Sequence, residues 1–306
     1  MYTDKIIVIG SANTDMVVKA AKLPLPGETL MGGTFFMNAG GKGANQAVAA
    51  ARLGGNVALV AKVGDDIFGK QTIVGLQKEN INTKYVFTDK EAPSGTAIIM
   101  VNEKGENCIV VAPGANANLL PADMEEVKMI STAEIILMQL EIPIETIEAV
   151  AKKAKMNSQK IIINPAPAQP LSDALLNGLF LITPNETEAT LLSGVTVTDE
   201  ITASKAADVF ITKGVQNVII TLGKQGAFFK NALLQLKINA PVVKALDTTA
   251  AGDTFSAAIS VAITEGMNWE QAIHFAIEAA TISVTRLGAQ SSVPYRRELS
   301  HNLITI

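Results

Sequence analysis

Asp247-Thr248-Thr249-Ala250-Ala251-Gly252-Asp253-Thr254-Phe255 is the stretch around which the rest of the chain can be placed. The residues before it, Val242 to Leu246, predict a short strand, and the Ala-rich run from Phe255 to Ile263 predicts a buried helix. The first backbone N–H groups of a helix have no acceptor within it, and small side chains leave these groups accessible. Such a helix start can therefore bind an anion. Asp253 lies in the first turn, where its carboxylate could take a proton from a hydroxyl beside that anion. The alternative is that Asp253 and Thr254 only cap the helix.

Composition excludes several classes of protein. The 306 residues are 48% hydrophobic with a net charge of −4, so no basic field favours nucleic acid. One cysteine, Cys108, excludes an internal disulfide and is typical of a reducing compartment, while two histidines argue against a histidine zinc site. The sequence shows no signal-peptide pattern and no apolar run long enough to span a membrane. We therefore expect a cytoplasmic protein with neither nucleic-acid nor membrane partners.

Short β-branched runs alternate with helical stretches along the whole chain. This pattern predicts an α/β fold with a mostly parallel sheet covered by helices on both faces. No linker separates two parts, so we expect a single domain over residues 1–306. The strands that the pattern predicts are Lys5–Ile9, Val57–Val60, Ile135–Leu140, Lys160–Ile163, Leu179–Ile182 and Val218–Leu222.

Two stretches depart from this alternation. Residues 94–101 and 107–111 are rich in apolar residues and flank a polar turn with Gly105, which predicts an antiparallel hairpin. Residues 16–37 are too interrupted by Pro and Gly for a helix. We interpret approximately 14–38 and 95–112 as a small second sheet, inserted in the domain, that could close over a site as a lid. An ordinary surface hairpin is the alternative.

Polar groups follow the predicted strands, and ligands of open parallel sheets bind beyond the carboxyl ends of their strands. This edge therefore suits a polyol and a nucleotide. Gly40-Gly41-Lys42-Gly43-Ala44-Asn45 precedes an Ala-rich helix that runs to about Leu53. Its spacing is neither a Walker A loop nor a dinucleotide fingerprint. Its glycines permit close backbone approach, Lys42 supplies a positive charge and Asn45 both a donor and an acceptor. A flexible turn entering a helix is the alternative.

These motifs together resemble those of the ribokinase family of carbohydrate kinases, in family order from Gly10 to Pro294. The resemblance implies a three-layer α/β sandwich with a mostly parallel central sheet and a small β-sheet lid. It also implies ATP-dependent phosphorylation of D-ribose at O5, giving ribose 5-phosphate and ADP. Phosphorylation of another pentose such as deoxyribose, or a non-catalytic sugar- or nucleotide-binding regulator on the same fold, stays open.

The resemblance also implies roles for single residues. Asp253 is the catalytic base, and the backbone at Ala250, Ala251 and Gly252 forms the anion hole, although many family members have Gly at position 250. The sugar-binding residues would be Asn13, Asp15, Gly41, Lys42, Gly43, Asn45, Glu141 and Asp253. The nucleotide-binding residues would be Asn185, Thr221, Leu222, Gly223, Lys224, Gln225, Gly226 and Gly252, with Ile277 near the adenine.

Two ions and a second subunit complete what the resemblance implies. Glu188, with Asn185, would help to place Mg²⁺ indirectly, although the same residues could simply cap a helix. A monovalent cation such as K⁺ would lie, mainly on backbone oxygens, among Asp247, Thr249, Ser283, Arg286, Gly288 and Ser292. An ion pair between Arg286 and Asp247 is the alternative there. The lid strands would join two copies as a homodimer through some of Ile98, Met100, Ile109 and Val111.

Overall fold

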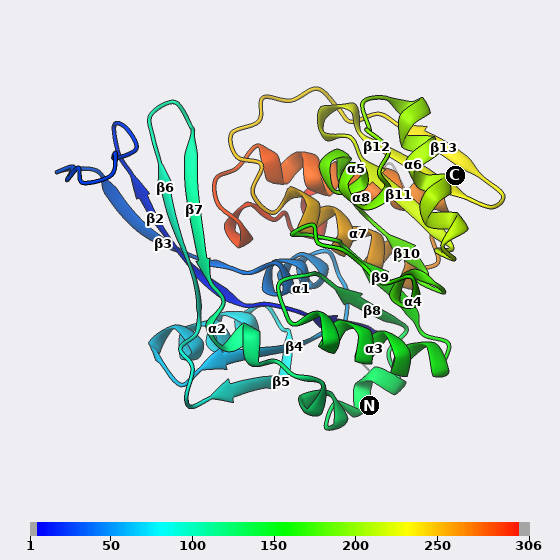
Figure 1. The fold of residues 1–306 in the computed structure, drawn as a ribbon, viewed down its shortest axis with the longest axis horizontal. Helices are drawn as coiled ribbons and strands as arrows, with labels where there is room; N and C mark the ends of the chain where they lie inside the picture. The colour runs from blue at the N-terminus through cyan, green and yellow to red at the C-terminus, as the bar shows by residue number, and fades with distance from the viewer. Residues whose placement is uncertain (1–4, 300–306) are drawn as a thin grey trace.

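A nine-stranded sheet runs through the middle of the molecule in the order β13-β12-β11-β10-β9-β8-β1-β4-β5 (Figure 1). The computed structural model describes residues 5–299. The sheet is parallel from β5 to β11, and β12 and β13 add an antiparallel edge. Its strands are β1 (Ile6–Ile9), β4 (Val57–Gly64), β5 (Asn82–Asp89), β8 (Ile135–Met138), β9 (Lys160–Ile163), β10 (Leu181–Ile182), β11 (Asn217–Thr221), β12 (Ala227–Asn231) and β13 (Gln235–Ile238). The predicted mostly parallel sheet is confirmed.

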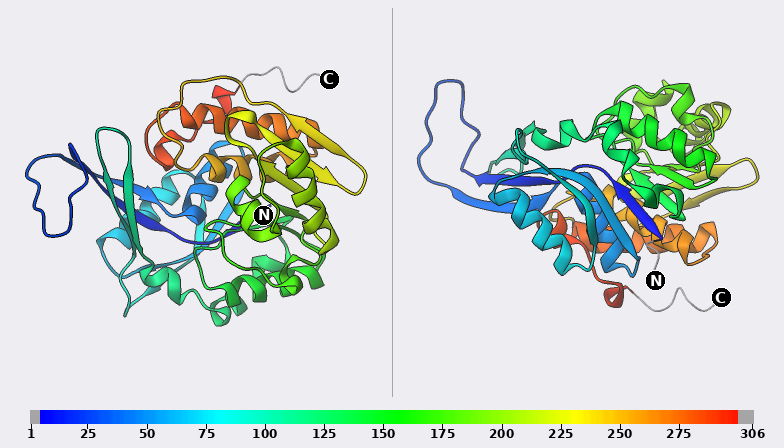
Figure 2. Two further views of the ribbon diagram at one scale, coloured as in Figure 1. Left: turned by 45° about the horizontal axis from the view of Figure 1, so that its top comes forward. Right: turned by 90° about the horizontal axis from the view of Figure 1, so that it is seen from below.

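Helices cover both faces of this sheet because its strands are apolar on both sides. Ile6 and Val8 of β1 point into one core and Ile7 and Ile9 into the other. On the first face lie α1 (Lys42–Arg52), α2 (Ile67–Lys78), α7 (Ala251–Thr264) and α8 (Trp269–Val284). On the second lie α3 (Ile144–Met156), α4 (Asp173–Leu176), α5 (Glu186–Ser193) and α6 (Glu200–Thr212) (Figure 2). The short 3₁₀ helices are η1 (Gly114–Asn118), η2 (Pro121–Glu125), η3 (Lys128–Ser131), η4 (Gly223–Gln225), η5 (Gln290–Ser292) and η6 (Arg296–Glu298). No helix within residues 5–299 combines the length and apolar character that a bilayer crossing requires.

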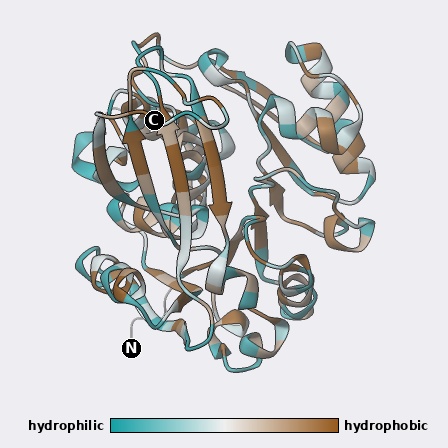
Figure 3. Ribbon diagram, turned by 60° about the vertical axis from the view of Figure 1, so that its left-hand side comes forward, coloured by the Kyte–Doolittle hydropathy of each residue, from teal (hydrophilic) through white to brown (hydrophobic). Residues whose placement is uncertain are grey.

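A second, four-stranded sheet projects from the body (Figure 1). Its order is β3-β2-β6-β7, and its strands are β2 (Asn13–Lys19), β3 (Thr34–Gly40), β6 (Gly95–Val101) and β7 (Asn107–Ala112). The predicted hairpin is confirmed as β6–β7, and the interrupted stretch forms the larger part of β2 and β3. Hydrophobic residues run along these strands (Figure 3). We call these four strands the small sheet.

The strand predicted at Val242–Leu246 is wrong. Residues 242–246 pair with no strand of either sheet, and β13, which ends at Ile238, remains the last strand of the central sheet. Val242 is fully exposed, and the N–H groups of Leu246 and Asp247 bond to the carbonyl of Val284 at the end of α8. β-branched residues favour a strand only where a neighbouring strand pairs with it. This segment has no such neighbour, and it forms a loop over the site.

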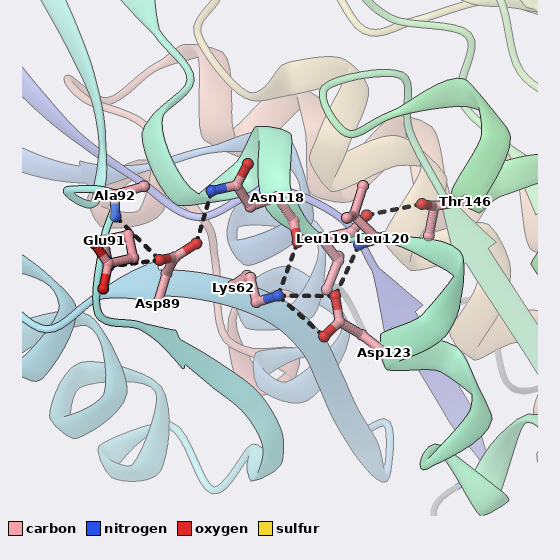
Figure 4. Close-up of polar contacts among 9 residues, drawn as sticks. All are labelled: Lys62, Asp89, Glu91, Ala92, Asn118, Leu119, Leu120, Asp123 and Thr146. Carbon is pink, nitrogen blue, oxygen red and sulfur yellow. Dashed lines mark hydrogen bonds and ion pairs between the residues drawn. The ribbon is translucent and has the colours of Figure 1, made fainter.

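The chain that returns from β7 is fastened to the central sheet by a polar cluster (Figure 4). Lys62 Nζ on β4 donates to both carboxylate oxygens of Asp123, at 3.0 and 2.9 Å, and to the carbonyl of Asn118 at 2.8 Å. Asn118 Nδ2 in turn donates to Asp89 Oδ2 at the end of β5, at 2.8 Å. The segment that follows β7 is therefore hydrogen-bonded to β4 and β5 of the central sheet.

Candidate active site

Asp253 is the third residue of α7, and its carboxylate points to α1 rather than along its own helix. It is 5% exposed. Asn45 Nδ2 donates to its Oδ2 at 3.0 Å, and Gln46 Nε2 donates to its Oδ1 at 2.9 Å. The N-cap is Ala250, so Asp253 does not serve as the cap residue of this helix. Its two side-chain partners lie more than 200 residues away in the sequence, which is why the fold must form before the carboxylate is held.

The start of α7 forms a cradle for an anion. Ala250 adopts a left-handed conformation, φ 60°, which turns the chain into the helix. The first N–H groups of a helix have no acceptor within it, and the helix dipole adds a partial positive charge. A Cβ placed on Gly252 would meet no protein atom within 4 Å. The space in front of these amides is therefore open to a phosphate-sized group.

The predicted sugar residues come together beside Asp253 from three elements. Asn13 and Asp15 lie on β2, Gly41 to Asn45 form the start of α1, and Glu141 follows β8. Glu141 Oε2 accepts hydrogen bonds from Ser11 Oγ at 2.5 Å and from the Lys42 N–H at 3.0 Å. Glu141 thereby joins the ends of β1 and β8 to the first turn of α1.

Close packing explains why glycine stands at two positions of this region. A Cβ on Gly40 would lie 2.2 Å from Asp15 Oδ2, so the carboxylate rests directly over that backbone. A Cβ on Gly43 would lie 2.6 Å from the carbonyl carbon of Gly10. Gly43 is therefore required for α1 to pack on the end of β1, whatever its contact with a sugar.

Four carboxylates surround one lysine in this region. Burial raises the pKa of Asp15 to about 6, with Glu141 and Asp253 adding to the rise and Lys42 opposing it. Burial would lower the pKa of Lys42, but Asp253, Glu141 and Glu188 outweigh it and leave that pKa raised. Lys42 therefore keeps its positive charge among these carboxylates.

A cavity of about 440 Å³ lies on the other side of the α7 N-terminus. The predicted nucleotide residues that line it are Asn185, Thr221, Gly223, Lys224, Gly226 and Gly252. Ile277, an apolar residue where the family often has a polar one near the adenine, lines it as well. Leu222 and Gln225 are not among the residues that line it: Leu222 packs into the core, and Gln225 is exposed. Val242, Val243 and Ala245 form part of its wall. The sequence did not indicate this wall, because those residues were interpreted as a strand of the sheet.

Asn185 and Glu188 form a capping box at the start of α5. Glu188 Oε2 accepts from the Asn185 N–H at 2.9 Å, and Asn185 Oδ1 accepts from the Glu188 N–H at 2.8 Å. Burial raises the pKa of Glu188, and Asp253 adds to the rise while Asn185 and Lys42 oppose it. No group of three His, Cys, Asp or Glu suited to a metal occurs in residues 5–299. These donors fit Mg²⁺, which takes one or two carboxylates and fills its shell with phosphate oxygens and water.

The predicted cation stretches lie next to each other behind the α7 start. Asp247 Oδ2 accepts from the Gly288 N–H at 2.9 Å, and its Oδ1 accepts from the Thr249 hydroxyl at 2.6 Å. Burial alone would raise the pKa of Asp247, but these hydrogen bonds outweigh it and leave the pKa lowered. Arg286 pairs with Glu298, so the ion pair with Asp247 is not formed. Ser283 and Ser292 are fully buried nearby, and their hydroxyls donate to the carbonyls of Ala280 and Ala289.

Sequence reasoning missed two buried glutamines. Gln46 and Gln139 are both 0% exposed, and Gln139 Nε2 donates to Gln46 Oε1 at 2.5 Å. Their only signal was a polar residue inside the Ala-rich run of α1 and another at the end of an apolar strand. That signal does not say which buried group each glutamine meets.

The sequence model for the pfkB family of carbohydrate kinases matches residues 3–296. The chain belongs to this family. The kinase is 46% identical over 294 residues to a ribokinase of Haemophilus influenzae, covering 96% of each chain. It is 37% identical over 291 residues to a deoxyribokinase of Salmonella typhi, covering 94% of this chain and 95% of the other. Its structure matches that of an Arabidopsis thaliana ribokinase in complex with ribose and ATP, with a TM-score of 0.92, 32% identity and full coverage of both chains. The similarity to carbohydrate kinases therefore extends over the small sheet as well as the body.

Proposed function

We propose that this kinase transfers the γ-phosphoryl group of ATP to the 5-hydroxyl of D-ribose, giving ribose 5-phosphate and ADP. The observation that carries the proposal is the place of Asp253, at the N-terminus of α7 between the sugar residues and the 440 Å³ cavity. Its 46% identity to a ribokinase over nearly the full chain supports ribose as the acceptor.

Each part of the site has a task in this reaction. Asp253 takes the hydroxyl proton as the sugar oxygen bonds to the γ-phosphorus and the bond to the bridging oxygen of ADP breaks. The amides of Gly252 and Asp253, with the helix dipole, stabilise the charge on the transferring group, whereas the Ala251 N–H already donates to the Thr248 carbonyl at 3.3 Å. Lys42 adds a positive charge, which the surrounding carboxylates favour. Asn185 and Glu188 would hold Mg²⁺, mostly through water, and the ion would neutralise phosphate charge.

A panel of sugars tests the acceptor. We expect ribose-dependent ADP release in the presence of ATP and Mg²⁺, with kcat/KM for ribose at least about 10-fold above that for deoxyribose, because a site that hydrogen-bonds a hydroxyl rejects the analogue that lacks it. A higher kcat/KM for deoxyribose would assign the chain to the alternative acceptor, that of the Salmonella typhi deoxyribokinase, to which the chain is 37% identical. No ADP release with any sugar would favour a binding regulator instead.

The cation proposal has a separate test. We propose that K⁺ binds to backbone oxygens around Asp247 and Gly288, because the hydrogen bond between these residues holds the two stretches together behind the anion cradle. K⁺ should then raise kcat well above its value in Na⁺ or Tris buffer of equal ionic strength. Equal activity in the three buffers would remove this site.

We also propose that the small sheet is the lid, that it covers the sugar, and that two copies of the chain join through it. Asp15 places one face of the small sheet toward the sugar residues, and closure there would keep water from the transferring phosphoryl group. A kinase that consumes ATP and carries a single, exposed cysteine suits the cytoplasm, where thiols stay reduced.

A further inference from the structure

The carboxylate of Asp253 rests on a buried network of amide side chains. Gln46 Nε2 donates to Asp253 Oδ1 at 2.9 Å and to Asn164 Oδ1 at 3.1 Å. Gln139 Nε2 donates to Gln46 Oε1 at 2.5 Å. Asn164 Nδ2 donates to the Thr183 carbonyl at 3.2 Å. The network therefore joins α1 and α7 to the carboxyl ends of β8, β9 and β10.

The two donors to Asp253 differ in how firmly they are held. Gln46 is 0% exposed and both ends of its amide have partners. Asn45 also donates to Asp253, but its Oδ1 is buried without a partner among the described residues. An unpaired buried acceptor is expensive, so Asn45 gains by accepting a hydrogen bond from a sugar hydroxyl. Asn45 can therefore change its hydrogen bonds when a sugar binds, whereas Gln46 keeps its hydrogen bond to Asp253.

We infer that Gln46 is a positioning residue that fixes Oδ1 of Asp253, so that Oδ2 is the oxygen that takes the hydroxyl proton. The inference rests on the proposed function. A carboxylate held at one oxygen keeps its plane, and small displacements of a reacting group cost about 10²-fold in rate. Gln46 contributes through Asp253 and not by touching the sugar.

The test replaces Gln46 with an apolar side chain of similar length. Gln46→Met should lower kcat by about 10–10²-fold while the KM values for ribose and ATP stay within about three-fold. In a plot of kcat against pH at saturating substrates, the fall on the acidic side, the acidic limb, should also move to higher pH. The reason is that the Asp253 carboxylate loses a hydrogen bond that favours its charged form. The matched control is Thr146→Val, since Thr146 is equally buried and its hydroxyl bonds to the Leu119 carbonyl, away from Asp253.

Gln46→Glu provides a second variant should the Met substitution unfold the protein. It keeps the size of the side chain but places a carboxylate beside Asp253, so the acidic limb of kcat should again move to higher pH. Unchanged kcat and an unchanged acidic limb in a folded Gln46 variant would overturn the inference, as would the same change in Thr146→Val. Absence of ribose-dependent ADP release from the unmodified protein would instead overturn the proposed function.

Discussion

Asp15 carries a cost for the folded protein that the proposed role in binding the sugar would explain. Burial, Glu141 and Asp253 raise its pKa from 3.8 to about 6. Since the folded state binds this proton more tightly than the unfolded state, the contribution of Asp15 to stability is full below about pH 3.8. It is lost as the pH rises through about 6. At neutral pH the charged carboxylate therefore lowers the free energy of unfolding.

Asp15→Asn should remove that cost. We expect its free energy of unfolding to exceed that of the unmodified protein by about 1–3 kcal/mol at pH 8, with the difference disappearing near pH 4. Ribose affinity should fall at the same time, because a charge-assisted acceptor is lost. Urea unfolding at the two pH values measures the effect, and the exposed Asp65→Asn is the control. Destabilisation by Asp15→Asn at pH 8 would contradict the account.

Single residues also show what sequence reasoning can reach. The start of the helix at Asp253 and the start of α1 at Lys42 were predictable, because small residues before an apolar run are a local signal. The contact between Asp253 and Gln46 was not, because it depends on α1 packing against α7 from 207 residues away. Polar residues inside an apolar run reveal their partners only once the fold is known.

At the scale of elements, local pattern predicted β1, β4, β8, β9, β10 and β11, but it missed β5 and the antiparallel strands β12 and β13. It failed at Val242–Leu246, where the same residue types have no neighbouring strand, and it did not indicate that β2 pairs in parallel with β6. Strand pairing depends on the positions of distant segments, whereas β-propensity describes only how well a residue fits a strand.

Asn116 connects two strands of the small sheet to each other at their bases. It is 1% exposed, its Oδ1 accepts from the Ala12 N–H at 2.9 Å, and its Nδ2 donates to Asn13 Oδ1 at 2.7 Å and to the Pro113 carbonyl at 3.0 Å. Asn116→Ala should raise the KM for ribose by about 10-fold and leave the KM for ATP within two-fold, because Asn13 loses its orienting partner. Steady-state kinetics with each substrate varied measures both constants.

The matched control is Asn118→Ala, two residues further along the chain. Asn118 is exposed and its side chain bonds to Asp89 at the surface, so neither KM should change. Equal rises in both KM values for Asn116→Ala would indicate a general folding defect and contradict a role in sugar binding.

At the scale of the whole molecule, the small sheet exposes apolar side chains on both faces. Its register places Ile109 and Val111 on the face of Asp15, and Ile98 and Met100 on the other. Ile109 is 53% exposed and Val111 47%. Apolar area of this kind usually marks an interface, and the face shared with Asp15 would couple such an interface to sugar binding.

We therefore expect a homodimer at micromolar concentration, measured by light scattering. Ile109→Lys should give monomers that bind ribose more weakly, because it puts a charge into that interface. Leu191→Lys is the control, since Leu191 is also exposed, at 57%, but lies on α5. A monomeric unmodified protein at micromolar concentration would contradict the dimer and leave the kinase activity unaffected.

The central claim is that Asp253 takes the proton while the start of α7 stabilises the phosphoryl group. Asp253→Asn keeps the size of the side chain but cannot act as the base, and Asn45, whose Oδ1 has no partner among the described residues, can turn to accept from the new amide. Single-turnover phosphoryl transfer from ATP to ribose, combined with calorimetric titration of each substrate, tests this most directly. The account predicts a rate lower by about 10²–10⁴-fold, with dissociation constants for ribose and ATP within a few-fold of those of the unmodified protein. A transfer rate within a few-fold of that of the unmodified protein would contradict it.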